Sequence, residues 1–253
     1  MLAFVFLLIV RDYKTVALPT AQQGGKATKV AARAIVTELL RPRTALVTCI
    51  GAGLSLFVVS TAYAWLPSYF NRFYGIAPDQ AGLKTGVVVL AGGIGALLWS
   101  MVADRLSSRI PRARLYVPAA AAVLTTIFMC SAFAFFPPGA AQYALIIAGG
   151  ITMAGSVGPT DAVVIDVIHP GLRATAASIL ALTRNLFGLA GGPLLTGALS
   201  DAYGLPFAMS IVPLGGLAGA VLLLVAARTY EKDLKAVQST APAVDTGLAP
   251  QPA

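Results

Sequence analysis

The stretch RATAASILALTRNLFGLAGGPLLTGALSDAYG, residues 173–204, places an arginine inside an apolar segment that is long enough to cross a membrane. Arg184 lies about ten residues into this segment, or roughly 15 Å from its start at 1.5 Å per residue. An ionisable side chain at that depth costs about 2.5–3.5 kcal/mol on insertion scales, so it faces protein or a water-filled cavity. We therefore interpret this stretch, with Asn185 beside the arginine, as part of a transport pathway.

The overall composition is that of a membrane protein with several spans. Of the 253 residues, 57% are hydrophobic and only 11% are charged, and the mean hydropathy is +0.80. Soluble domains carry about 25% charged residues. The net charge of +8 is explained by basic loops rather than by a nucleic-acid partner. Cys49 and Cys130 lie in apolar stretches without a histidine cluster, so neither a disulfide framework nor a metal site is indicated.

Apolar segments and polar connections alternate along the chain. Residues 1–10 are apolar but too short to span, and they are predicted to be the remnant of a preceding transmembrane helix. A signal peptide is the alternative, although no basic residues precede the apolar run. Residues 11–43 form a basic linker, and residues 229–253 a tail predicted to be disordered. Between them lie six segments that are each long enough to span, at about 44–70, 83–103, 115–136, 142–165, 174–200 and 206–228.

The basic residues predict the orientation of these segments. They gather in the linker before the first segment, in the loop after the second, at the start of the fifth and in the tail. These four places lie on one side of the membrane, and cytoplasmic loops carry the excess of Lys and Arg. We therefore expect a multi-pass protein of the cell's inner membrane, with the lipid bilayer around it and both termini cytoplasmic.

A short pattern occurs twice, at the ends of the second and fifth segments. Asp104 lies between Ser100 and Ser107, and Asp201 lies between Gly197 and Gly204, with the same spacing. The two copies fall in equivalent positions of two successive three-helix units, on opposite sides of the membrane. Inverted three-helix repeats of this kind are typical of secondary transporters.

These residues resemble the C-terminal half of a major facilitator superfamily transporter. DRLSSR at 104–109 resembles the family's cytoplasmic motif G-x-x-x-D-R-x-G-x-R, with serines in place of both glycines. The segment DVIHPGLRATAASILALTRNLFGLAGGPLLTGALSD at 166–201 is similar to the bacterial spinster-like branch. The resemblance covers residues 1 to about 232. It implies an all-α integral membrane fold of six helices, built from two inverted repeats.

The resemblance also implies a missing or separate N-terminal half and a set of gating residues. It places the loop after the second segment beside the start of the fifth, where Asp104 would meet the positive end of a helix dipole. Arg173 could add an ion pair there. A contact that breaks when the halves rock can bias which side is open. The residues expected to take part in this gating are Asp104, Arg105, Arg109, Arg173 and Asp201.

A carboxylate in the fourth segment is the predicted partner of Arg184. Asp161 follows Gly158 and Pro159, and the proline predicts a kink. Asp161 lies at roughly 10 Å depth, close enough to Arg184 for an ion pair beside the cavity. We expect this pair to be buried, with Asp161 able to take a proton during transport. The alternatives are a permanently paired structural bridge, or an Asp161 that reaches the cytoplasmic headgroups together with Asp166.

The first apolar segment supplies two further candidates for contact with a substrate. Thr61 and Tyr63 lie in its outer half, where they could line a cavity. We interpret the chain as a secondary active transporter of major facilitator type for a small organic or lipid-like solute. The alternative is a non-transporting fragment, or an assembly partner that needs a separate N-terminal half. The sequence contains no phosphate-binding loop, HExxH or G-x-S-x-G motif, so neither an enzyme nor a cofactor is indicated.

Overall fold

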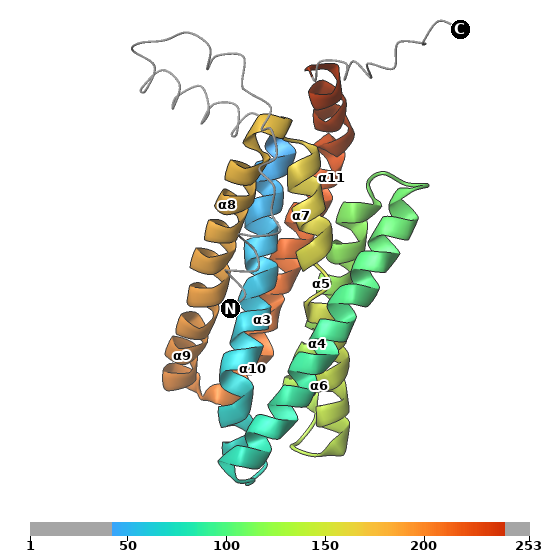
Figure 1. Cartoon of the computed structure of the whole chain (residues 1–253). Coiled ribbons are helices and arrows are strands. Elements are labelled where there is room, and N and C mark those ends of the chain that lie inside the picture. Colours follow the sequence, from blue (N-terminus) through green and yellow to red (C-terminus); the bar gives the residue numbers. More distant parts are fainter. Residues whose placement is uncertain (1–41, 241–253) are drawn as a thin grey trace, which may run out of the picture.

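The computed structural model of the chain describes residues 42–240, which form an elongated bundle of antiparallel helices (Figure 1). The predicted remnant at 1–10, nearly all of the linker and the last part of the tail, residues 241–253, lie outside the described residues. Within 42–240, five stretches are long and apolar enough to cross a membrane. They are Arg43–Phe73 (α3), Pro78–Ser107 (α4), Ala113–Phe135 (α5), Ala140–Asp166 (α6 and α7) and Leu205–Val237 (α10, η4 and most of α11).

Residues 173–203 cross the bundle as three consecutive helical pieces. These are α8 (Arg173–Thr183), the π-helix η3 (Arg184–Ala190) and α9 (Gly191–Tyr203). At the end of η3 the carbonyl of Gly188 accepts from the backbone N–H of Gly191, and it also accepts from the hydroxyl of Ser60 of α3 (2.8 Å). The all-α fold predicted from the sequence is therefore confirmed, with a crossing that is helical but not uniformly α-helical.

The fourth crossing is broken at its middle. Helix α6 (Ala140–Met153) ends before a turn at 154–156, and α7 begins at Val157 and ends at Asp166. Pro159 was expected to kink this segment. It lies in the first turn of α7, where its missing N–H removes no helical hydrogen bond, so the interruption precedes it.

Two glycines allow the tight connections at one end of the bundle. Gly75, between α3 and α4, has φ of 65°, and Gly204, between α9 and α10 (Leu205–Ile211), has φ of 87°. Both values lie in the left-handed region that other residues rarely adopt. Pro78 then begins α4 at a position where its fixed φ suits the first helical turn. These turns keep successive helices antiparallel.

Helix α3 lies at the centre of the bundle and α4 at its edge. In α3, 67% of the most apolar window is buried, against 22% in α4. Small residues allow close approach: a Cβ on Gly95 of α4 would collide with the backbone of Ile151 in α6. Because so little of α4 is buried, much of this helix is an exposed apolar surface, which includes Leu83, Leu90, Ile94 and Leu97.

The last helix, α11, extends from Gly215 to Thr240. The predicted disorder from residue 229 is therefore wrong as far as Thr240. The carboxylate of Asp233 accepts a hydrogen bond from the backbone N–H of Thr44 (3.0 Å), and the hydroxyls of Thr44 and Thr229 share another (2.7 Å). These contacts attach the polar end of α11 to α3, which the composition of the tail did not indicate.

Candidate functional site

The two predicted partners inside the bundle are in contact. Arg184 Nη1 donates to Asp161 Oδ1 at 2.6 Å, joining the start of the π-helix to α7. Nη2 of the same guanidinium donates to the carbonyl of Val157 (3.0 Å) and to the hydroxyl of Thr160. The arginine is thus held by three groups of α7. Its partner is Asp161, the carboxylate predicted from its depth in the fourth apolar segment.

The two members of this pair differ in exposure. The side chain of Arg184 is 13% exposed, whereas that of Asp161 is 44% exposed. Among residues 42–240, Arg184 is the only hydrogen-bond partner of the Asp161 carboxylate. The pair is therefore not fully buried as predicted: Arg184 is largely covered, whereas Asp161 is partly exposed and lines an open pocket.

This pocket lies between α7 and α8 and has a volume of about 230 Å³. Asp161 and Arg184 form its polar part, and its walls are Val164, Ile165, Ala177, Leu180 and Ala181. Its size is just below the range of about 300–1,000 Å³ that is usual for ligand pockets. Its combination of apolar walls and few polar groups is typical of sites that bind part of an organic molecule.

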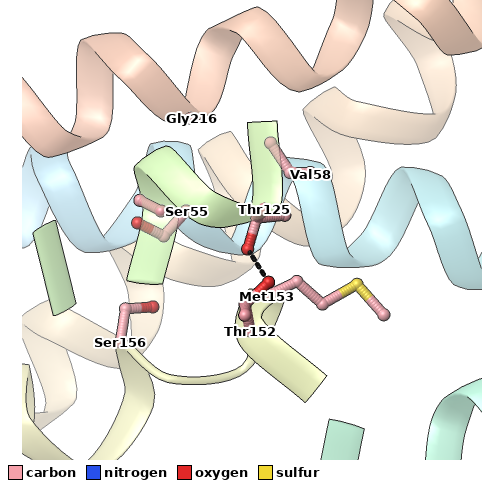
Figure 2. A pocket seen from close by; sticks show the side chains of 8 residues that line it. Ser55, Val58, Thr125, Thr152, Met153, Ser156 and Gly216 are labelled. Carbon is pink, nitrogen blue, oxygen red and sulfur yellow. Dashed lines mark hydrogen bonds between the residues drawn. The ribbon is translucent and has the colours of Figure 1, made fainter. Parts of the chain in front are cut away.

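A second, much smaller cavity lies beside the break between α6 and α7 (Figure 2). Its volume of about 10 Å³ is at the lower limit for holding one water molecule. The hydroxyls of Thr125 and Thr152 share a hydrogen bond across it (2.8 Å), and Ser55 and Ser156 also line it. The cavity is thus a small, partly polar site inside the bundle, separate from the pocket at Asp161.

The residues expected to take part in gating do not form the predicted contact. Asp104 was expected beside the start of the fifth segment and Arg173. Instead, its carboxylate lies 3.5 Å from Nε of Arg114, at the start of α5. Nη1 of Arg114 donates to Asp166 Oδ2 (2.5 Å), which also accepts from the hydroxyl of Tyr230 (3.1 Å). Arg114 therefore joins the ends of α4 and α7 to α5, because the short loop after α4 returns the chain beside its own helix.

Arg112 forms a second ion pair at the same end of the bundle. Its Nε lies 2.7 Å from Oε1 of Glu231 on α11, and this contact raises the pKa of the Arg112 guanidinium. The other expected gating residues are exposed and form no side-chain hydrogen bond or ion pair with any residue of the described range. They are Arg105, Arg109, Arg173 and Asp201. Their proposed role in gating is not tested by these contacts.

The remaining candidates lie apart from the pocket at Asp161. Thr61 is buried and shares a hydrogen bond with Thr196 of α9 (3.1 Å). Tyr63 is half-buried, with its hydroxyl against Gly92 of α4. Asn185 is exposed and has no side-chain hydrogen bond within residues 42–240. The structure therefore brings Asp161 and Arg184 together, and none of these three residues lines their pocket, although Asn185 follows Arg184 in the chain.

Sequence reasoning missed Arg114, Thr160 and Tyr230 as members of these polar clusters. Arg114 stood in a run of basic loop residues, which predicted orientation rather than a specific partner. Thr160 was recognisable only as the neighbour of Asp161. Among the described residues, no group of His, Cys, Asp or Glu side chains could hold a metal ion.

Comparison with known proteins assigns this chain to a family of membrane transporters. The family described as the Major Facilitator Superfamily matches residues 1–192 of the chain. Protein spinster homolog 1 of Xenopus tropicalis is 25% identical over 226 residues, which cover 79% of this chain and 43% of that protein. An MFS-type efflux pump of Mycolicibacterium smegmatis is 28% identical over 196 residues, which cover 75% of this chain and 43% of the pump. The chain thus spans less than half the length of these relatives.

The fold is also similar to a solved structure. It resembles the crystal structure of a bacterial homolog to the human lysosomal transporter Spinster, in an inward-facing and unoccupied conformation. The TM-score is 0.62 at 18% sequence identity, with 94% of this chain and 57% of that chain covered. At this identity the likeness concerns the fold alone, and it supports the expected fold class.

Proposed function

Because this chain belongs to the Major Facilitator Superfamily, we propose that it is the C-terminal half of a secondary active transporter. The transporter would work by alternating access and move a small organic or lipid-like solute. The observation that carries this proposal is the ion pair of Asp161 and Arg184, which lies beside an open pocket in a multi-pass membrane protein. Ionisable residues at such depth mark substrate paths and proton relays.

The roles of the two charged residues follow from their surroundings. Arg184 is held by α7 through three hydrogen bonds and serves to position the carboxylate. Asp161 is open to the pocket and is the group that would take a proton during transport. Loss of its charge would weaken its contact with Arg184 and so weaken the link between α7 and η3. Protonation could thus change which arrangement of the two helices is favoured.

A second six-helix half is the proposed partner of this chain. In this fold the solute site lies between two halves, and α4 exposes a long apolar surface that α3 does not. The partner half would cover part of that surface and the bilayer would cover the rest. The alternative is a chain that inserts in the membrane without transporting.

The localisation of this multi-pass protein is proposed to be the inner membrane, with the cytoplasm at the Arg112 and Arg114 end of the bundle. The excess of basic residues at that end supports this orientation. Accessibility of cysteines introduced at exposed loop positions would test it. Labelling of Ser108→Cys by an impermeant maleimide in inverted vesicles, and not in intact cells, is the expected result.

Transport is tested with the gene expressed together with its native flanking sequence. Asp161 is replaced in that gene. We expect inverted membrane vesicles to accumulate a fluorescent lysophospholipid or ethidium when a proton gradient is present. Asp161→Asn should abolish gradient-driven accumulation, whereas Asp79→Asn, an exposed carboxylate in the first turn of α4, should leave it unchanged. Undiminished accumulation with Asp161→Asn would refute proton coupling at this residue. Membrane insertion without accumulation of any probe would favour the alternative.

A further inference from the structure

The pocket between α7 and α8 presents a hydrogen-bond acceptor beside a guanidinium that is largely covered and already bonded to α7. The guanidinium of Arg184 is largely covered, and its Nη1 and Nη2 donate to Asp161, Val157 and Thr160. The carboxylate of Asp161 uses Oδ1 for this contact. Its Oδ2 has no hydrogen-bond partner within residues 42–240, although the side chain is 44% exposed. An ionised carboxylate can only accept hydrogen bonds.

The rest of the pocket is suited to hydrocarbon. Val164 and Ile165 of α7 and Ala177, Leu180 and Ala181 of α8 form the walls. The volume of about 230 Å³ accommodates a head group and a short apolar portion rather than a whole drug-sized molecule. Asp161 lies five residues before the end of α7, or about 8 Å along the helix, so the head group would sit below the end of the helix and not in the loop.

We propose that this pocket binds a protonated amine carried on an apolar chain, with the ammonium group donating to Oδ2 of Asp161. The proposal rests on the transporter function above and names the class of solute for its site. An anionic head group is disfavoured, because the charge of Arg184 is already paired with Asp161 and the carboxylate of Asp161 would repel an anion in the same pocket. A neutral polar head group would gain less from the carboxylate, because hydrogen bonds to charged groups are stronger when the donor is also charged.

The experiment measures binding without transport, using two probes of equal chain length and opposite charge. Radiolabelled octylammonium and octanoate are dialysed to equilibrium against the chain in nanodiscs, with protein-free nanodiscs to subtract partition into lipid. We expect octylammonium to show a saturable component of one molecule per chain, and octanoate to show none. Saturable binding of octanoate that is lost in Arg184→Gln would overturn the proposal.

Two charge variants should move amine binding in different directions. Asp161→Asn keeps an acceptor for Arg184 but removes the charge, and it should weaken octylammonium binding at least tenfold. Arg184→Gln removes the competing cation and should leave amine binding equal or tighter. Asp79→Asn, which removes an exposed carboxylate far from the pocket along the chain, should change nothing. Unchanged amine binding in a folded Asp161→Asn variant contradicts the proposal.

A variant whose larger side chain fills the pocket keeps the test decisive if Asp161→Asn does not fold. Ala177 is exposed on α8, so Ala177→Phe should be tolerated while it fills the pocket, and it should weaken octylammonium binding without changing any charge. Retained binding in this variant would place the amine elsewhere and refute the site. A chain that binds octylammonium but supports no transport contradicts only the proposed function. Transport by a chain that shows no amine binding contradicts only this inference.

Discussion

Asp161 and Asp166 lie five residues apart on α7, and both pair with an arginine, yet the two pairs are built in opposite ways. In the pair at Asp161, the arginine is largely covered and the aspartate is partly exposed. Among the described residues, Arg184 forms an ion pair with no other carboxylate. At Asp166 acid and base are equally exposed, at 29% each, and Arg114 also has Asp104 at 3.5 Å. The first pair depends on a single carboxylate that a ligand or proton can reach. The second is a shared network that tolerates the loss of one member.

The largest expected effect is on the pair with a single carboxylate. Asp161→Ala leaves the guanidinium of Arg184 covered and without a counter-charge, so we expect the free energy of unfolding to fall by about 3 kcal/mol. The measurement is denaturant-induced unfolding of the purified chain in detergent. Asp161→Asn should cost less, because the amide oxygen still accepts from Arg184. Equal costs for both variants would show that the charge, and not the hydrogen bond, holds the arginine.

A smaller effect is expected at the shared network. Asp166→Ala removes the hydrogen bonds from Arg114 and Tyr230 but leaves Arg114 beside Asp104, so the cost should be about 1–2 kcal/mol. The double variant Asp104→Asn with Asp166→Ala should cost more than the sum of the two single changes, because Arg114 then has no carboxylate partner among the described residues. Additive costs would show that Asp104 does not share in holding Arg114.

The tyrosine of the network should contribute one hydrogen bond. Tyr230→Phe keeps the buried ring and removes the donor to Asp166, so we expect a cost of about 1 kcal/mol in the same unfolding measurement. Phe70→Leu would not serve as a control, because it changes packing. Tyr203→Phe is suitable, since that residue is exposed on α9. A cost for Tyr230→Phe no larger than for Tyr203→Phe would remove the tyrosine from the network.

The smallest effect is expected for Asp104 alone. Its side chain is 63% exposed and its contact with Arg114 is an ion pair without a hydrogen bond. Solvent screens such pairs, so Asp104→Asn should change the free energy of unfolding by less than about 0.5 kcal/mol. A change well above that value would mean that Asp104 has a contact with the part of the protein beyond residues 42–240.

The sequence predicted the helical fold and the main ion pair because both follow from one-dimensional distances. Counting residues from the ends of two apolar segments placed Asp161 and Arg184 at similar depth, and a charge at that depth requires a partner. The exposure of Asp161 could not be predicted in this way. It depends on which side of α7 faces α8, and that is set by the break at 154–156 and by the start of the π-helix.

The gating contact could not be derived from the sequence because it depends on tertiary placement. Asp104 had several arginines within a few residues of the chain, and nothing in their spacing distinguished Arg114 from Arg109. The choice is made by the turn after α4, which returns α5 beside it. Thr61 illustrates the same limit, since its hydroxyl could line a cavity or join a helix contact, and it binds Thr196.

The π-helix η3 also affects how the crossings of the membrane are counted. Residues 173–203 are divided among three helical pieces, and this stretch is not among the five that are long and apolar enough to span. An odd number of crossings would put the start of α3 and the end of α11 on opposite faces of the bilayer. In the structure both lie at the same end of the bundle (Figure 1). A reporter fused after α11 would therefore report on the compartment that the start of α3 faces. The irregular crossing by residues 173–203 makes the number of crossings even.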